Sequence, residues 1–171
     1  MICAIDPGKN GALSYLQNGE VEAFNMPETE GDIVKLFMDT IGRKEPMDTI
    51  EIFMEKLTGF CGGSGNPGSA MFTLAKYYWC WIFLAIAFDV RINLVTPQKW
   101  QKFLDFGTKG SVRGKTTKEK YVINRDWKNK LKGEAQRLYP AIKVTLDNCD
   151  SLLILEYARR ITFHEEAKSL F

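Results

Sequence analysis

The first 25 residues constrain the fold more than any other part of the chain. Residues 2–6, ICAID, form a short apolar run that ends at Pro7-Gly8, a pattern typical of a buried strand followed by a turn. Residues 12–17 and 21–25 then flank Asn18-Gly19, and Asn-Gly favours the tight type I′ turn of a hairpin. The chain is therefore expected to begin with three adjacent strands.

The remaining residues alternate between helical and strand patterns. Further strands are predicted at residues 47–56 and 91–96, and helices at about 31–42, 69–88, just after Pro97, 117–138 and 147–167. Residues 59–68 and 108–117 are predicted loops. This order indicates an α/β protein with the ribonuclease H-like fold, a mixed five-stranded sheet flanked by helices. The 171 residues contain no linker and suit a single domain over residues 1–171.

Cysteine and histidine content limits the chemistry. The four cysteines form no C-x-x-C pair, which argues against a disulfide framework or a structural zinc site and favours a reducing compartment. We expect a cytoplasmic protein, and a phage or viral protein acting in its host cell remains open. His164 is the one histidine, so two-histidine metal sites such as H-E-x-x-H are excluded. Catalysis would have to use carboxylates, lysines or hydroxyls.

Charge is distributed unevenly along the chain. The formal net charge is only +2, but residues 98–138 hold 12 basic and 4 acidic residues, a net of +8, and the remainder carries a net of −6. A solvated helical face is the ordinary explanation of such a segment. Here five aromatic residues are interleaved with the basic ones, and that combination suits phosphates together with stacked bases. We therefore expect nucleic acid as the partner.

Residues 77–88, YYWCWIFLAIAF, form the longest apolar run. Twelve residues are fewer than the roughly 20 that span a bilayer, so no membrane association is expected. The run is apolar nearly all round, whereas a helix needs one apolar stripe for its own core. A homodimer with Tyr77, Trp81 or their neighbours at the interface would cover the surplus.

Four carboxylates stand where such a fold could bring them together. Asp6 ends the first strand, Glu55 ends the fourth, and Asp147 and Asp150 are expected on one face of the last helix at i and i+3 spacing. Each has an ordinary structural explanation as a turn, edge or helix-terminal residue. Together they would repel one another unless a cation neutralised them, and oxygen ligands select a hard ion such as Mg²⁺ or Mn²⁺.

Four segments carry a resemblance to a known family. ICAIDPGKNGALSYL, FMEK, TPQKWQKFLDFG and DNCDSLLILEYARR resemble the RuvC-like Holliday junction resolvases, particularly their phage and viral branch, over nearly the whole chain. The resemblance implies a homodimeric crossover junction endodeoxyribonuclease, a hydrolase that cuts four-way DNA junctions with two Mg²⁺ or Mn²⁺ ions per active site. Its acidic tetrad would be Asp6, Glu55, Asp147 and Asp150.

Basic and aromatic residues complete the expected DNA contacts. The resemblance places Lys102, and less directly Lys115 or Lys118, near the scissile phosphate, and Phe60 at the junction centre. The full set of candidate DNA-binding residues is Phe60, Lys99, Lys102, Lys109, Arg113, Lys115, Lys118 and Lys120. Residues 59–68 and 108–132 depart from the bacterial pattern, so neither the preferred cut sequence nor selectivity among branched substrates is implied.

Two other readings compete. Sugar and acetate kinases also place an Asp-x-Gly turn after a first strand, but they need two such domains and this chain has room for one. A junction-binding protein that keeps the fold without cleaving DNA is the non-enzymatic alternative, and the complete set of four carboxylates argues against it.

Overall fold

The computed structural model describes residues 1–42, 50–57 and 68–169, with side chains of the last helix described as far as Phe163. The strands are β1 (Ile2–Asp6), β2 (Ala12–Gln17), β3 (Glu20–Asn25), β4 (Glu51–Glu55) and β5 (Arg91–Val95). The helices are α1 (Glu30–Phe37), α2 (Gly68–Ala87), α3 (Pro97–Phe103), α4 (Thr117–Leu138) and α5 (Cys149–Ser169), and a short π-helix, Met38–Gly42, follows α1.

The strands form one mixed sheet in the order β3-β2-β1-β4-β5. The first three strands pair antiparallel, and β4 then pairs parallel with both β1 and β5. Asn18 and Gly19 connect β2 to β3 with φ angles of 53° and 83°, as a type I′ turn requires. The predicted α/β class, the five-stranded sheet and the opening hairpin are confirmed.

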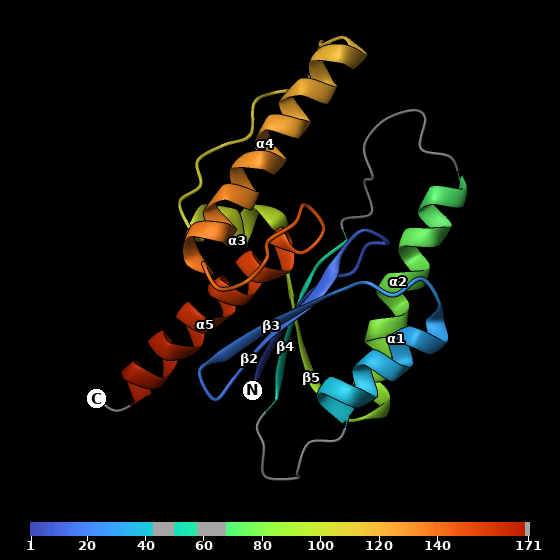
Figure 1. Cartoon of the computed structure of the whole chain (residues 1–171), viewed down its shortest axis with the longest axis vertical. Helices are drawn as coiled ribbons and strands as arrows, with labels where there is room; N and C mark the ends of the chain where they lie inside the picture. The colour runs from blue at the N-terminus through green and yellow to red at the C-terminus, as the bar shows by residue number, and fades with distance from the viewer. Residues whose placement is uncertain (43–49, 58–67, 170–171) are drawn as a thin grey trace.

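Helices cover both faces of this sheet, with α1 and α2 on one side and α3, α4 and α5 on the other (Figure 1). Alternate residues of β1 supply the two cores, because successive side chains of a strand point to opposite faces. Cys3 and Ile5 pack with the core beneath α1 and α2, whereas Ala4 packs with the core beneath α5. β4 repeats the pattern, with Phe53 on the α5 side.

Several predicted boundaries differ from the structure. The prediction for α4 matches its bounds, but α5 begins at Cys149 and not at 147, so Asp147 lies in the turn before the helix. β4 is shorter than residues 47–56, of which 47–49 lie outside the described residues. The predicted loop at 59–68 also falls almost wholly outside them.

Helix α2 shows which of its faces is buried. Tyr77 and Trp81 are 1% and 0% exposed within this one chain, so the expectation of a dimer interface is wrong for these two residues and stays a prediction for their exposed neighbours. Trp81 packs against Phe37, and the Tyr77 hydroxyl donates to the carbonyl of Glu28 at 3.0 Å. The exposed apolar side chains lie elsewhere on the helix, and we call them the α2 outer face: Phe72, Trp79, Phe83 and Ile86.

The same helix is long and apolar enough to cross a membrane when judged by length and composition alone. It has 20 residues, more than the 12-residue run suggested, and its most apolar window has a mean hydropathy of 1.4. Core helices of soluble proteins meet the same criterion. One side of α2 packs on the sheet through Tyr77, Trp81 and Ala85, but only 22% of this window is buried within the one chain.

Candidate active site

Asp6 and Glu55 end two neighbouring parallel strands. The register between β1 and β4 pairs Ile5 with Met54, so the two acidic residues follow at the same level of the sheet. Side chains beyond the carboxyl ends of parallel strands gather at one edge, which is where open α/β sheets bind ligands. Both residues are half-buried there.

The turn after Asp6 is held by a close backbone approach at Gly11. The Gly11 amide donates to the carbonyl of Gly8 at 2.9 Å, and Gly11 in turn accepts from the amide of Met26 at 2.9 Å. A Cβ atom at position 11 would lie 2.0 Å from the carbonyl oxygen of Asp6, which no side chain tolerates. Glycine at this position therefore allows the turn to fold back beside the carboxylate.

Helix α5 brings a third carboxylate to the same edge. The buried hydroxyls of Ser151 and Ser14 are 2.7 Å apart and join the first turn of α5 to β2. Ser151 also donates to the carbonyl of Asn148 at 2.9 Å. These bonds fix the start of the helix over the sheet, and Asp150 precedes Ser151 by one residue.

Asp147 occupies a different position from the one predicted. Its amide donates to the Thr145 hydroxyl at 3.2 Å within the turn, and its side chain is half-buried. Neither Asp147 nor Asp6 lines the groove that Glu55 and Asp150 share. The charge of Asp147 still reaches Asp6, where it is the weakest of the named influences on that carboxyl group.

Burial and mutual repulsion act on the carboxylates. The pKa of Asp6 is raised to about 7, first by burial and then by the charge of Asp150. The pKa of Glu55 is raised to about 8, by burial and then by the charges of Asp6 and Asp150. Asp6, Glu55 and Asp150 therefore form an electrostatically coupled group, which we call the acidic cluster. Strongly shifted carboxyl groups in a cleft mark a candidate functional site.

Two residues not singled out for this role contact the acidic cluster. The indole Nε1 of buried Trp100 donates to Glu55 Oε2 at 3.2 Å, which orients that carboxylate. Lys128 of α4 forms an ion pair with Asp150. Burial is the largest single influence on Lys128 and lowers its pKa, but the combined attraction of Asp150, Cys149 and Asp6 raises the pKa above its usual value. The apolar spacing of Leu131 and Ala135, three and seven residues after Lys128, could have placed Lys128 on the inner side of its helix.

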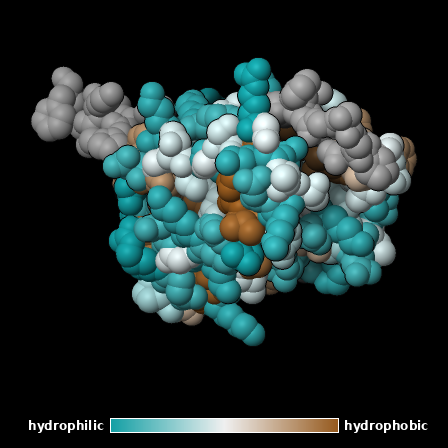
Figure 2. Space-filling model, turned by 90° about the horizontal axis from the view of Figure 1, so that it is seen from above, coloured by the Kyte–Doolittle hydropathy of each residue, from teal (hydrophilic) through white to brown (hydrophobic). Residues whose placement is uncertain are grey.

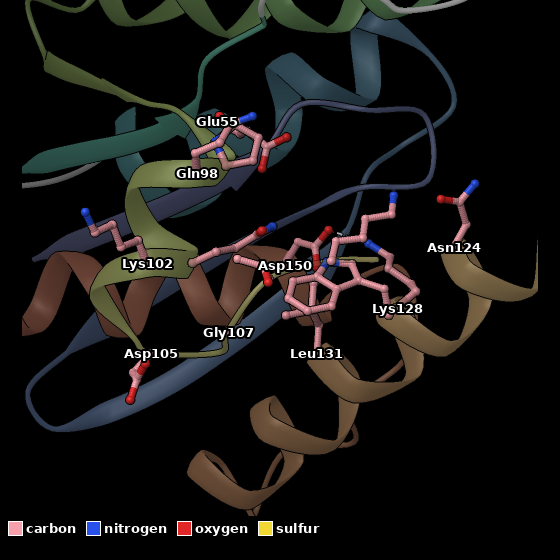
Figure 3. Close-up of a pocket in the computed structure, with 14 residues that line it drawn as sticks. Glu55, Gln98, Lys102, Asp105, Gly107, Asn124, Lys128, Leu131 and Asp150 are labelled. Carbon is pink, nitrogen blue, oxygen red and sulfur yellow. Dashed lines mark hydrogen bonds and ion pairs between the residues drawn. The ribbon is translucent and has the colours of Figure 1, made fainter. Parts of the chain in front are cut away.

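A groove of about 930 Å³ opens in front of the cluster and is lined by residues from α3, α4 and α5 and from the loop after α3 (Figure 3). Glu55 and Asp150 lie on its wall together with Lys102, Lys109 and Lys128. Trp127 adds an aromatic surface to the same wall. Viewed from above, the molecule is largely hydrophilic with hydrophobic side chains near the middle (Figure 2). The groove thus combines acidic, basic and aromatic groups.

None of the other candidate DNA-binding residues that the structure describes lines this groove. Lys99 is exposed on α3 and lines a smaller hollow of about 240 Å³ with Arg91 and Tyr157. Phe60 lies outside the described residues. The others are exposed on the loop before α4 or on its first turn: Arg113, Lys115, Lys118 and Lys120. The N-terminal half of α4 extends beyond the sheet, which gives this basic region its own exposed surface (Figure 1).

The donor chemistry of the acidic cluster suits a hard divalent cation, because all three groups offer carboxylate oxygens. Their arrangement is not that of a formed metal site. Across residues 1–42, 50–57 and 68–163, no three acidic, histidine or cysteine side chains are grouped so that they could hold a metal ion. In this arrangement the positive charge next to Asp150 comes from Lys128.

Comparison with known proteins bears on the fold. No family model and no curated protein matches the sequence. Among solved structures, RuvC of T. thermophilus in complex with a Holliday junction substrate matches with a TM-score of 0.55 and 11% sequence identity, covering 94% of this chain and 95% of that one. The match thus extends over almost the entire length of both chains. The chain therefore has a RuvC-like, ribonuclease H-like fold.

Proposed function

We propose that this protein is a metal-dependent endonuclease that hydrolyses phosphodiester bonds in branched DNA, with four-way junctions as its main substrate. The observation that carries the proposal is the acidic cluster, of which Glu55 and Asp150 line a basic and aromatic groove. The RuvC-like fold supports it, since the structure that matches is bound to a Holliday junction. Membership of the phage and viral branch, and a role in recombination and repair, belong to this proposal.

Asp6, Glu55 and Asp150 would hold Mg²⁺ or Mn²⁺, with Asp147 at the edge of the site. When bound, the ions would lower the pKa of an attacking water and stabilise the leaving oxygen. The chain itself does three things. Trp100 orients Glu55, the turn at Gly11 holds Asp6 in place, and Lys102 and Lys109 present ammonium groups to the phosphates of a strand in the groove.

Binding of the branched substrate would extend beyond the groove. Lys115, Lys118 and Lys120 form an exposed basic surface on and before the first turn of α4. Lys115 lies 3.6 Å from Glu119, which also closes a capping box with Thr116, so this end of the helix is well defined. Phosphate contacts of this kind position a substrate without reading its sequence. These contacts therefore do not show which residues would set a preference for a particular cut sequence.

A homodimer completes the proposal. The α2 outer face exposes Phe72, Phe83 and Ile86 by 75%, 62% and 68% of their surfaces. A second copy of the chain would cover these side chains and place two active sites in opposed orientation, as paired cuts across a nearly two-fold symmetric junction require. Phe83→Glu should then give a monomer by sedimentation, whereas Val34→Glu on α1 provides a control at another exposed apolar position. A wild-type particle of 19.5 kDa, alone and on junction DNA, would refute the dimer.

The experiment for the nuclease compares labelled four-way, three-way and linear DNA in Mg²⁺, Mn²⁺ or EDTA, with mapping of the product ends. Cleavage of the branched substrates only with metal, leaving 5′-phosphate and 3′-hydroxyl ends, is the expected result. Asp6→Asn, Glu55→Gln and Asp150→Asn should abolish cleavage and retain binding, and Asp147→Asn is expected to do the same.

Glu51→Gln is the matched control, because it removes a carboxylate from the opposite end of β4. Normal cleavage by Asp6→Asn would contradict the mechanism. Tight junction binding without any cleavage would favour the non-enzymatic alternative, a junction-binding protein with the same fold.

A further inference from the structure

Lys128 is the part of the site that the proposed function does not explain. Its ammonium group pairs with Asp150, and the two side chains are 34% and 16% exposed. The same positive charge acts on Asp6 and on Glu55, where it opposes their mutual repulsion. Lys128 therefore compensates the whole acidic cluster and not one carboxylate alone.

We propose that Lys128 is a built-in counter-cation of the acidic cluster, and that its ammonium group must leave Asp150 before the cluster can hold a divalent ion. The inference rests on the proposed function, because it assumes that the cluster is the metal site. Lys128 would then be a positioning residue, because it sets how tightly the DNA-free protein binds metal.

Competition for the same oxygens is the physical basis. A carboxylate that is ion-paired with an ammonium group has that oxygen committed, and two cations at one site repel each other. Without either cation, the partly buried carboxylates would be left uncompensated, which is costly.

The structure also restricts how the ammonium group can move. The backbone of α4 is fixed near Lys128, because Leu131 and Ala135 are buried and Lys130 donates to the carbonyl of Phe106 at 2.6 Å. Only the flexible side chain of Lys128 can swing. Asn124 and Lys128 line the same groove, so a displaced ammonium group would remain where a DNA phosphate can accept it (Figure 3). Metal and DNA would then strengthen each other's binding, since coupling between sites is reciprocal.

The test is a Mn²⁺ titration of the DNA-free protein, with free Mn²⁺ followed by electron paramagnetic resonance. Lys128→Gln should bind Mn²⁺ at least about tenfold more tightly than the wild type, because the competing charge is gone. Lys128→Arg keeps a charge and should stay within about threefold of wild type. Lys132→Gln removes a lysine one turn further along α4 and is the matched control, expected to behave as wild type.

A second measurement leaves Lys128 itself unchanged. In the wild-type chain, the Nζ resonance of Lys128 should shift as Mg²⁺ is added, and it should not shift in Asp6→Asn, which lacks one of the carboxylates.

Equal Mn²⁺ affinity of wild type and Lys128→Gln, or an Nζ resonance that ignores Mg²⁺ while the protein binds it, would overturn the inference and leave the nuclease proposal standing. Failure of every variant to bind Mn²⁺ would overturn both.

Discussion

Asp6→Asn should make the metal-free protein more stable at alkaline pH. The pKa of Asp6 is about 7 in the folded chain against a reference of 3.8, so the folded state holds its proton over a pH range where the unfolded state has lost it. The free energy of unfolding therefore falls as pH rises from about 4 to about 7. In this range the folded state binds more protons than the unfolded state, so removing protons favours unfolding. Asparagine does not ionise, so the Asp6→Asn protein does not lose stability in this way as pH rises.

The size of the effect follows from the two pKa values. Linkage between pKa values of 3.8 and about 7 makes the ionisation of Asp6 cost the folded state about 2 to 3 kcal/mol more at pH 8 than at pH 5. Most of this change falls between pH 5 and pH 7, and it levels off above the folded pKa. Glu55, with a pKa of about 8, repels Asp6 and shares part of the effect.

Urea unfolding in EDTA at pH 5, 6, 7 and 8 measures it. The stability of Asp6→Asn relative to wild type should increase from pH 5 to pH 7 and change little between pH 7 and pH 8, whereas Glu51→Gln should not reproduce the increase. Added Mg²⁺ should reduce the difference, because a bound cation stabilises the ionised carboxylate of the wild type. Parallel pH profiles for wild type and Asp6→Asn would refute the argument that burial and repulsion at this edge of the sheet disfavour the charged form.

Three further predictions test the DNA-binding surface and the packing around the site. Replacing Lys115, Lys118 and Lys120 together should weaken binding to all DNA. The slope of log affinity against log salt concentration should fall by up to about 3 units, measured by titration at several salt concentrations. Gly11→Ala should destabilise the fold by about 1 to 3 kcal/mol in urea unfolding and lower cleavage further than stability alone explains, because the turn carrying Asp6 must shift. Ser151→Ala should cost about 1 to 2 kcal/mol, and the Ser14→Ala/Ser151→Ala pair less than the sum of the two single changes.

Local patterns were sufficient for much of the fold. Asn18-Gly19 predicts the hairpin because few residue pairs adopt positive φ angles, and the structure has them there. The predicted bounds of α4 match the structure, in which a Thr116 capping box stands at its start and Pro140 follows its end. The placement of Asp6 and Glu55 at strand ends needed only the apolar runs that precede them. Each of these features depends on residues that are close together in the sequence, so one sequence is enough to predict them.

Features that depend on packing were predicted less well. The sequence contains no local signal that separates Asp147 from the start of α5. In the structure, the Asn148 side chain accepts from the amide of Thr145 and donates to the carbonyl of Lys143. These two bonds hold residues 145–148 in a turn before the helix. The buried side of α2 was also misplaced, because a helix that is apolar nearly all round has no polar face to orient it. Phe37 and Met26 decide that orientation by contacting Trp81.

The contact of Lys128 with Asp150 could not be predicted from the sequence. The basic segment offers 12 lysines and arginines with similar surroundings in sequence, and charge alone does not distinguish one of them. The choice depends on the rotation of α4 against α5, which the burial of Leu131 and Ala135 determines. That rotation turns Lys128 toward Asp150 while Lys118 and Lys120 stay in solvent. A basic helix can thus supply DNA contacts at one end and a counter-cation for the acidic cluster ten residues later, because its exposed half reaches beyond the sheet and its buried half packs on α5.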